Sequence, residues 1–149
     1  MKRYPLLLLS ILALALGSTA AGAEEEAAKT IVRAEIRGLK STKGKLFCSI
    51  YAKAEGWPAK SALQNQTLVI RGKDAVCTFE GLKAGTYAVS VLHDENGNGE
   101  MDYGTFGAPA EGWASSNNVT HTFSGPDFQE SSFTLKAGET KVLSLEVHN

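Results

Sequence analysis

Apolar and polar residues alternate along much of the chain in short runs, the pattern expected of β-strands that bury one face. In residues 32–37 apolar side chains alternate with charged ones, and in residues 46–51 a second apolar set recurs at every other position. The clearest run, residues 85–91, has a bulky apolar residue at every second position. No long stretch keeps the 3.6-residue period of an amphipathic helix, so the fold is predicted to be nearly all β.

Turn residues separate several further candidate strands. We expect these strands at residues 67–71, 75–80, 119–123, 131–135 and 141–147. Residues 54–66 are predicted to form a loop with at most one helical turn. Seven or eight short strands in a chain of this length predict an all-β, Greek-key β-sandwich. The strand that starts at Gly85 is expected to deliver His93 and Asp94 to the surface, where a connection of unusual length runs to about Asn118.

The first residues predict export. Lys2 and Arg3 precede an apolar run over residues 6–16 that ends in small residues, as in a secretory signal peptide. We expect residues 1–23 to be this leader, with cleavage after Ala23, and residues 24–149 to be a single sandwich domain in the periplasm or secreted. The apolar run is too short to span a bilayer, so no membrane span is expected after cleavage.

Charge and cysteine content narrow the function. Removing a leader that contains Lys2 and Arg3 lowers the 15 basic residues to 13 against 16 acidic ones, a net charge near −3. A nucleic-acid-binding surface needs a basic stripe, so nucleic acid is excluded as a partner. Cys48 and Cys77 are the only cysteines, and in an exported domain they are expected to form a disulfide, with two buried free thiols as the alternative.

The long connection begins with H-D-E-N-G-N-G-E-M-D, residues 93–102. Its oxygen-bearing residues have the spacing of positions 1, 3, 5, 7 and 9 of a calcium loop, with a glycine at position 6. The candidate metal ligands are Asp94, Asn96, Asn98, Glu100 (through its carbonyl) and Asp102. Position 12 is Thr105 where such loops place a bidentate glutamate, so a structural Ca²⁺ is expected to bind weakly, with Glu111 as a possible closing ligand.

A metal-free alternative explains the same residues. Asp94, Asn96 and Asn98 are able to accept hydrogen bonds from their own backbone in successive Asx-turns, while Gly97 and Gly99 supply positive φ. Both interpretations predict an ordered polar loop at the end of the central strand.

The chain resembles the small exported bacterial proteins of domain-of-unknown-function family 2141. The resemblance rests on these motifs: Gly85-Thr86-Tyr87, H-D-E-N-G-N-G-E-M-D, Phe106-Gly107-Ala108-Pro109, Glu111-Gly112-Trp113 and Ser116-Asn117-Asn118. It implies an immunoglobulin-like or transthyretin-like sandwich in the periplasm or at the cell surface, and it supplies no activity. The Leu82-x-x-Gly85-x-Tyr87 spacing also resembles a tyrosine corner, so Tyr87 is expected to be structural.

These residues favour binding over catalysis. Candidate ligand-binding residues are His93, Trp113, Ser116, Asn117 and Asn118, which suit an envelope protein, a peptide or a glycan as partner. The structural alternative is that His93 caps the sandwich, Trp113 plugs its end, and the asparagines satisfy loop backbone. Neighbouring strand residues face opposite sides, so His93 and Asp94 do not form a catalytic pair in the usual way. We expect a non-catalytic binding module, with an accessory subunit of an envelope complex or a His93 hydrolase as alternatives.

Overall fold

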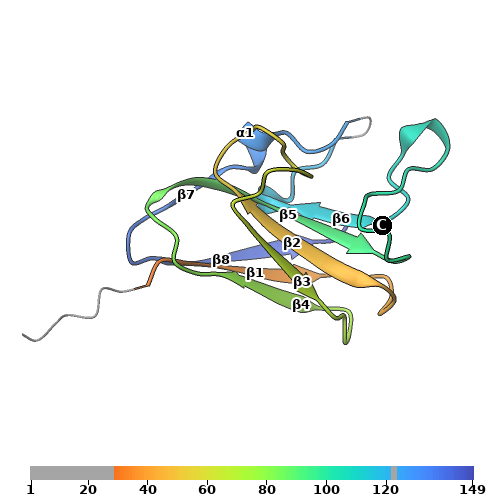
Figure 1. The fold of residues 1–149 in the computed structure, drawn as a ribbon, viewed down its shortest axis with the longest axis horizontal. Coiled ribbons are helices and arrows are strands. Elements are labelled where there is room, and N and C mark those ends of the chain that lie inside the picture. Colours follow the sequence, from red (N-terminus) through yellow and green to blue (C-terminus); the bar gives the residue numbers. More distant parts are fainter. Residues whose placement is uncertain (1–28, 122–123) are drawn as a thin grey trace, which may run out of the picture.

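The computed structural model describes residues 29–121 and 124–149, which form two β-sheets packed face to face (Figure 1). The predicted leader, residues 1–23, lies outside the described residues. One sheet has three strands in the order β4 (Ala75–Phe79), β1 (Ile31–Arg37), β8 (Thr140–Glu146). Strand β1 runs antiparallel to β4 and parallel to β8, with Ile31 opposite Thr140 and Arg37 opposite Glu146.

The second sheet has five strands and carries the long connection. Its strands are β2 (Lys45–Tyr51), β3 (Gln64–Leu68), β5 (Gly85–Asp94), β6 (Gly112–Ser115) and β7 (Phe133–Leu135). The order is β3-β2-β5-β6, and β7 pairs with the beginning of β5. Short helical segments complete the chain: η1 (Thr105–Gly107), η2 (Ser116–Asn118) and α1 (Phe128–Ser131). The predicted all-β sandwich is confirmed, with eight strands.

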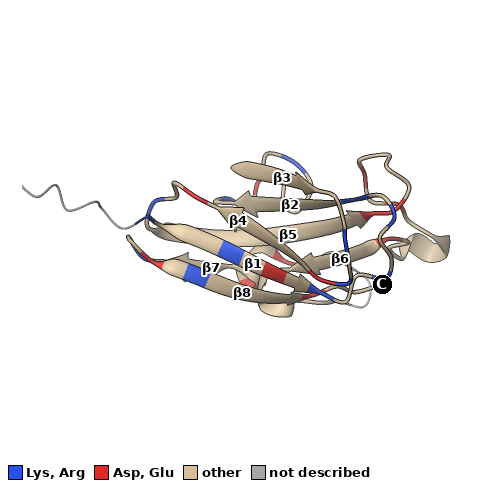
Figure 2. Cartoon of the chain, turned by 90° about the horizontal axis from the view of Figure 1, so that it is seen from below, with Lys and Arg blue, Asp and Glu red and all other residues tan. Residues whose placement is uncertain are grey.

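The core lies between the sheets and follows the predicted alternation. Along β1, Val32, Ala34 and Ile36 are fully buried, while the residues between them face outward and give the strand bands of both charges (Figure 2). The Cys48–Cys77 disulfide joins β2 to β4 across this core, with 6.5 Å between the Cα atoms. The predicted pairing is therefore confirmed, and the bond links the two sheets.

The tyrosine corner is also confirmed. The Tyr87 hydroxyl donates a 3.0 Å hydrogen bond to the Lys83 carbonyl, four residues upstream. This bond fixes the turn that leads into β5, the strand from which the long connection leaves.

Three predicted elements differ from the structure. Residues 119–121 form no strand, and residues 122–123 lie outside the described part; the strand beside β5 is instead β6, which the sequence analysis placed inside the connection. Strand β3 begins at Gln64 rather than at residue 67, and it belongs to the sheet opposite β4. Strand β7 begins at Phe133 rather than at residue 131, where α1 ends. Residues 54–63 form turns without a helix, which agrees with the loop predicted there.

Side-chain amides close the edges between the two sheets. Gln66 of β3 donates to the Thr78 carbonyl of β4 and accepts a 3.1 Å bond from the Thr78 N–H. On the other side, Asn118 donates to the Ser144 carbonyl at 3.0 Å and accepts from the Glu146 N–H at 2.9 Å. Each amide therefore occupies the place of a neighbouring peptide group, which shields strands β4 and β8 from pairing with another chain.

Among residues 29–121 and 124–149, no helix has the length and apolar character that crossing a bilayer requires.

Candidate functional site

The connection between β5 and β6, residues 95–111, projects from one end of the sandwich (Figure 1). Its outer half is a small hairpin in which Tyr103 pairs with Pro109. The Gly104 N–H donates to the Ala108 carbonyl at 2.8 Å and closes the turn that contains η1. We call residues 95–111 the projecting loop and residues 103–109 its tip.

Asp94 organises the inner half of the projecting loop. Its side chain is fully buried at the end of β5. One carboxylate oxygen accepts from the Gly97 N–H at 2.7 Å and the Asn98 N–H at 3.2 Å, and the other accepts from the Gly99 N–H at 2.9 Å. Three backbone donors thus converge on one carboxylate, which orders the loop around it.

The predicted metal ligands come together here, in the hydrogen-bond pattern of the metal-free alternative. The Asn96 and Asn98 carbonyl oxygens accept from backbone N–H groups two residues on, at 2.9 Å each, as Asx-turns do. Both side-chain amides donate to the Asp102 carboxylate. The backbone N–H of Glu100 donates to the Asn98 side-chain oxygen, and the Glu100 side chain is exposed. No group of three or more His, Cys, Asp or Glu residues suited to a metal occurs in the described chain.

Glu111 clamps both ends of the inner half. Its side chain is only 6% exposed. One oxygen accepts from the Glu95 N–H at 2.8 Å and the other from the Asp102 N–H at 3.3 Å. The sequence suggests Glu111 as a closing ligand for calcium; in the structure its carboxylate holds the backbone of the projecting loop.

Two glycines allow the base of the projecting loop to close. A Cβ atom on Gly44, where φ is +69°, would lie 1.8 Å from the Asp94 carbonyl oxygen. A Cβ atom on Gly112 would lie 2.9 Å from both the Val147 side chain and the Asn149 side chain. Any side chain at either position would therefore push neighbouring backbone or side chains away from the base.

The predicted surface position of His93 and Asp94 is wrong, because both residues have 0% exposure. Gly112 and the β1–β2 link cover this end of β5: His93 pairs with Gly112 in the sheet, and its Nε2 lies 3.1 Å from the Lys43 carbonyl. His93 Nδ1 is buried and has no hydrogen-bond partner. A direct contact between His93 and a ligand would require this end of the sandwich to open.

The other predicted ligand-binding residues are engaged within the protein. Trp113 is half-buried, and its ring lies 5.1 Å from that of His148. The Ser116 hydroxyl accepts from the Val89 N–H at 2.9 Å and donates to the Ser131 carbonyl. The Asn117 amide donates to the carbonyls at 130 and 132, and Asn118 bridges two groups of β8. The contacts of Ser116, Asn117 and Asn118 match the structural alternative, whereas Trp113 lies outside the hydrophobic core and does not plug it.

The tip carries exposed aromatic residues that the sequence analysis did not single out. Phe106 has a relative exposure of 101% and Tyr103 one of 66%. Phe106 also has a left-handed backbone, with φ 62° and ψ 19°, a conformation that favours glycine. The glycines at 104 and 107 on either side were the available sequence signal for a tight turn that displays this residue.

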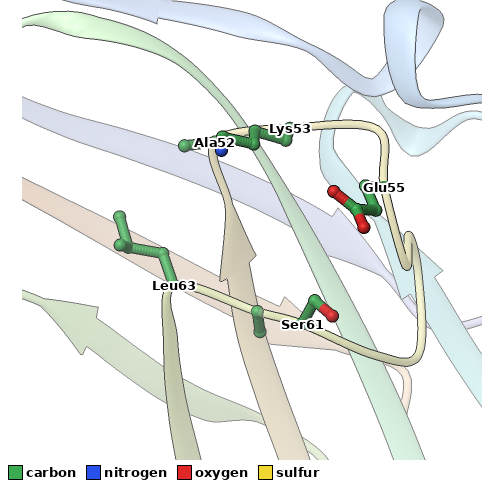
Figure 3. A pocket seen from close by; sticks show the side chains of 6 residues that line it. Ala52, Lys53, Glu55, Ser61 and Leu63 are labelled. Atoms are coloured by element: carbon green, nitrogen blue, oxygen red, sulfur yellow. The ribbon is translucent and has the colours of Figure 1, made fainter.

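Two adjoining hollows lie elsewhere, beside the loop that follows β2. One, of about 350 Å³, has Leu63 on one side and Glu55 on the other, with Lys53 at its rim (Figure 3). The second, of about 330 Å³, shares Ala52 and Leu63 with the first and extends to Leu82 and Tyr87. The second hollow is lined mainly by apolar surface, whereas the first is lined by polar and apolar side chains in similar measure.

Comparison with protein families gives one match. The family model described as "Uncharacterized protein conserved in bacteria (DUF2141)" matches residues 34–143. The match runs from β1 to β8 and includes the projecting loop. Comparisons with curated proteins and with solved structures found no match.

Proposed function

Because the chain belongs to the DUF2141 family of uncharacterised bacterial proteins, we propose its function from its geometry: an exported, non-catalytic binding module of the bacterial envelope, whose working end is the projecting loop. The sandwich supplies the support and the tip supplies the contact surface. An accessory role in an envelope complex is the most specific form of this proposal.

A rigid base supports the proposal. Recognition surfaces work best when their residues are held in place before the partner arrives. Asp94 and Glu111 are buried carboxylates that together accept five backbone N–H bonds from the projecting loop. Hydrogen bonds to charged acceptors are stronger than those between neutral groups. The tip is therefore presented in one orientation.

The left-handed backbone and full exposure of Phe106 are the main support for the proposal. A left-handed backbone costs a non-glycine residue of the order of 1–3 kcal/mol. A fully exposed phenyl ring gains no burial within the chain that would offset that cost. Aromatic residues are enriched at the centres of protein interfaces because each buries a large apolar area with little loss of side-chain freedom. Contact with a partner gives this arrangement a physical reason.

Site-specific photo-crosslinking in cells tests the proposal. A photoreactive phenylalanine analogue replaces Phe106 in one variant and Val142 in a control, because Val142 is 55% exposed on the other sheet. We expect a covalent adduct from position 106 and none from position 142. Equal yields from both positions, or no adduct from position 106, would contradict a working end at the tip.

In this proposal, calcium stabilises the projecting loop and has no catalytic role. The residues that would hold it are Asp94, Asn96, Asn98 and Asp102, which lie together around the inner half of the projecting loop. The two amides that now donate to Asp102 would have to turn so that their oxygens face the ion. That rearrangement adds to the effect of the missing position-12 carboxylate and favours weak binding.

A further inference from the structure

Two apolar side chains at opposite ends of the sandwich are exposed. Phe106 stands on the tip, and Leu63, 53% exposed, lines both hollows. The Leu63 N–H donates to the Ile50 carbonyl at 2.8 Å, so Leu63 lies where β2 ends. The projecting loop leaves β5 at the other end of the same strand pair, about six residues or 20 Å away by strand geometry. The tip of one molecule therefore does not reach its own hollows.

The hollow beside Leu82 has the chemistry to receive an aromatic ring. Its apolar lining consists of exposed Leu63 and the accessible edges of buried Leu82 and Tyr87, and Lys83 is also among its lining residues. The adjoining hollow adds Lys53, together with one acidic residue, Glu55. Both hollows, of about 330 and 350 Å³, are shallow and open to solvent, so a ring placed there would be covered only in part.

The charges around the two surfaces also favour contact between the tip and the hollows. Between Lys83 and Lys136 the chain has seven acidic residues and no lysine or arginine. The projecting loop contributes exposed or part-exposed Glu95, Glu100 and Asp102 and buried Glu111 to this acidic stretch. An acidic surround disfavours an anionic membrane surface as the target of the tip, and it favours a surface that has lysines around an apolar centre.

We propose that the hollow at Leu63 receives the tip of a second copy of this chain, with Phe106 of one copy packed against Leu63 and Leu82 of the next. The inference rests on the proposed working end and names its partner. The two surfaces differ, so the contact is heterologous: a pair of molecules still has one free tip and one free hollow. Association therefore continues into open chains and does not stop at a dimer. One ring in a shallow hollow forms a small interface, so the association is weak.

Sedimentation equilibrium of the purified protein tests this inference. Between about 10 µM and 1 mM, where interfaces of this class associate, we expect the average mass to rise steadily past that of a dimer. Phe106→Ser and Leu63→Ser should each weaken association by about tenfold to a hundredfold, from the apolar burial lost. Val142→Ser removes an apolar residue about as exposed as Leu63, and association should be unchanged.

A mixture of the two variants gives the sharpest result. Phe106→Ser retains an intact hollow and Leu63→Ser retains an intact tip, so an equimolar mixture should form dimers and no longer chains. A mixture that stays monomeric while the wild type associates would show that the tip does not enter the hollow, and Leu63→Ser that still associates by itself would show tip-to-tip contact; either result would overturn the inference. Wild-type protein that is monomeric up to about 1 mM would also overturn it. Both positions are exposed, so unchanged thermal unfolding of each variant confirms that the fold is intact.

The same variants separate this inference from the proposed function. If position 106 crosslinks in cells to a different envelope protein and the purified protein does not associate, the working end stands and the second copy is the wrong partner. If position 106 crosslinks to nothing and the protein is monomeric, both proposals fail.

Discussion

Replacing Asp94 with alanine should release the inner half of the projecting loop. The carboxylate accepts three backbone N–H bonds, and each bond to a charged acceptor contributes about 1.5–3 kcal/mol. The released donors at residues 97–99 gain contact with water, which returns much of this energy. We therefore expect the free energy of local opening to fall by about 3 kcal/mol. A loss of this size speeds amide exchange at residues 97–99 by about a hundredfold.

Asp94→Asn refines the test. The asparagine retains one oxygen that accepts from Gly97 and Asn98, and it loses the acceptor for Gly99 and the negative charge. We expect about half the alanine effect, concentrated at Gly99.

Amide hydrogen exchange followed by nuclear magnetic resonance measures both variants. Glu100→Gln is the control: Glu100 lies in the same loop, but its carboxylate is exposed, so amide exchange at residues 97–99 should be unchanged. Unaltered exchange at residues 97–99 in Asp94→Ala would refute the assigned role of the carboxylate. An equal rise at every amide of the sandwich would show global destabilisation in place of local release.

Three further outcomes are expected. Replacing Cys48 and Cys77 together with alanine should lower the free energy of unfolding in urea by about 3–4 kcal/mol, from a bridge that spans 29 residues; no change would show that the bridge adds no stability. Tyr51→Phe removes a 2.7 Å bond to the Pro58 carbonyl and should cost about 1 kcal/mol at neutral pH. Burial raises the pKa of Tyr51, so wild-type stability from this group is complete below about pH 10 and is lost as the pH rises through the folded-state value; the Tyr51→Phe variant should lack that alkaline loss in a series of melts. Calorimetric titration with calcium should give a dissociation constant of about 10⁻⁴–10⁻³ M that weakens in Asn98→Ala, and a flat titration would remove the ion from the proposal.

The central strands were predictable because apolar and polar residues alternate along them in the same order as their buried and exposed positions. Val32, Ala34 and Ile36 alternate with charged residues, and each enters the core as the period requires. Tyr87 and the cysteines were equally readable, since a corner motif and a lone cysteine pair each have few structural solutions.

The edge strands were less predictable because side-chain amides and tertiary contacts define them. Strand β3 contains Gln64 and Gln66, which resemble loop residues in a sequence, yet both side chains donate to carbonyl groups in and just after β4. Strand β6 offers only Ala114 to the core and starts at Gly112, so its pairing with β5 outweighs its weak strand propensity.

The projecting loop was predictable in composition and not in geometry. Asp94 and the following asparagines predicted an ordered polar turn, which the hydrogen bonds match. The burial of His93 and Asp94 depends on the close approach of Gly44 and Gly112 from distant parts of the chain. The display of Phe106 depends on a backbone angle, and no pattern of hydrophobic residues reports that angle.

The parallel pairing of β1 with β8 also determines when the molecule can finish folding. Ile31 faces Thr140, so the first strand of the sandwich waits for the last to be synthesised before its sheet is complete. A chain still emerging from the ribosome has only β4 to place beside β1. Contacts between such distant residues slow folding because a long segment must first be ordered. The three-stranded sheet is therefore completed only when nearly the whole chain has been made.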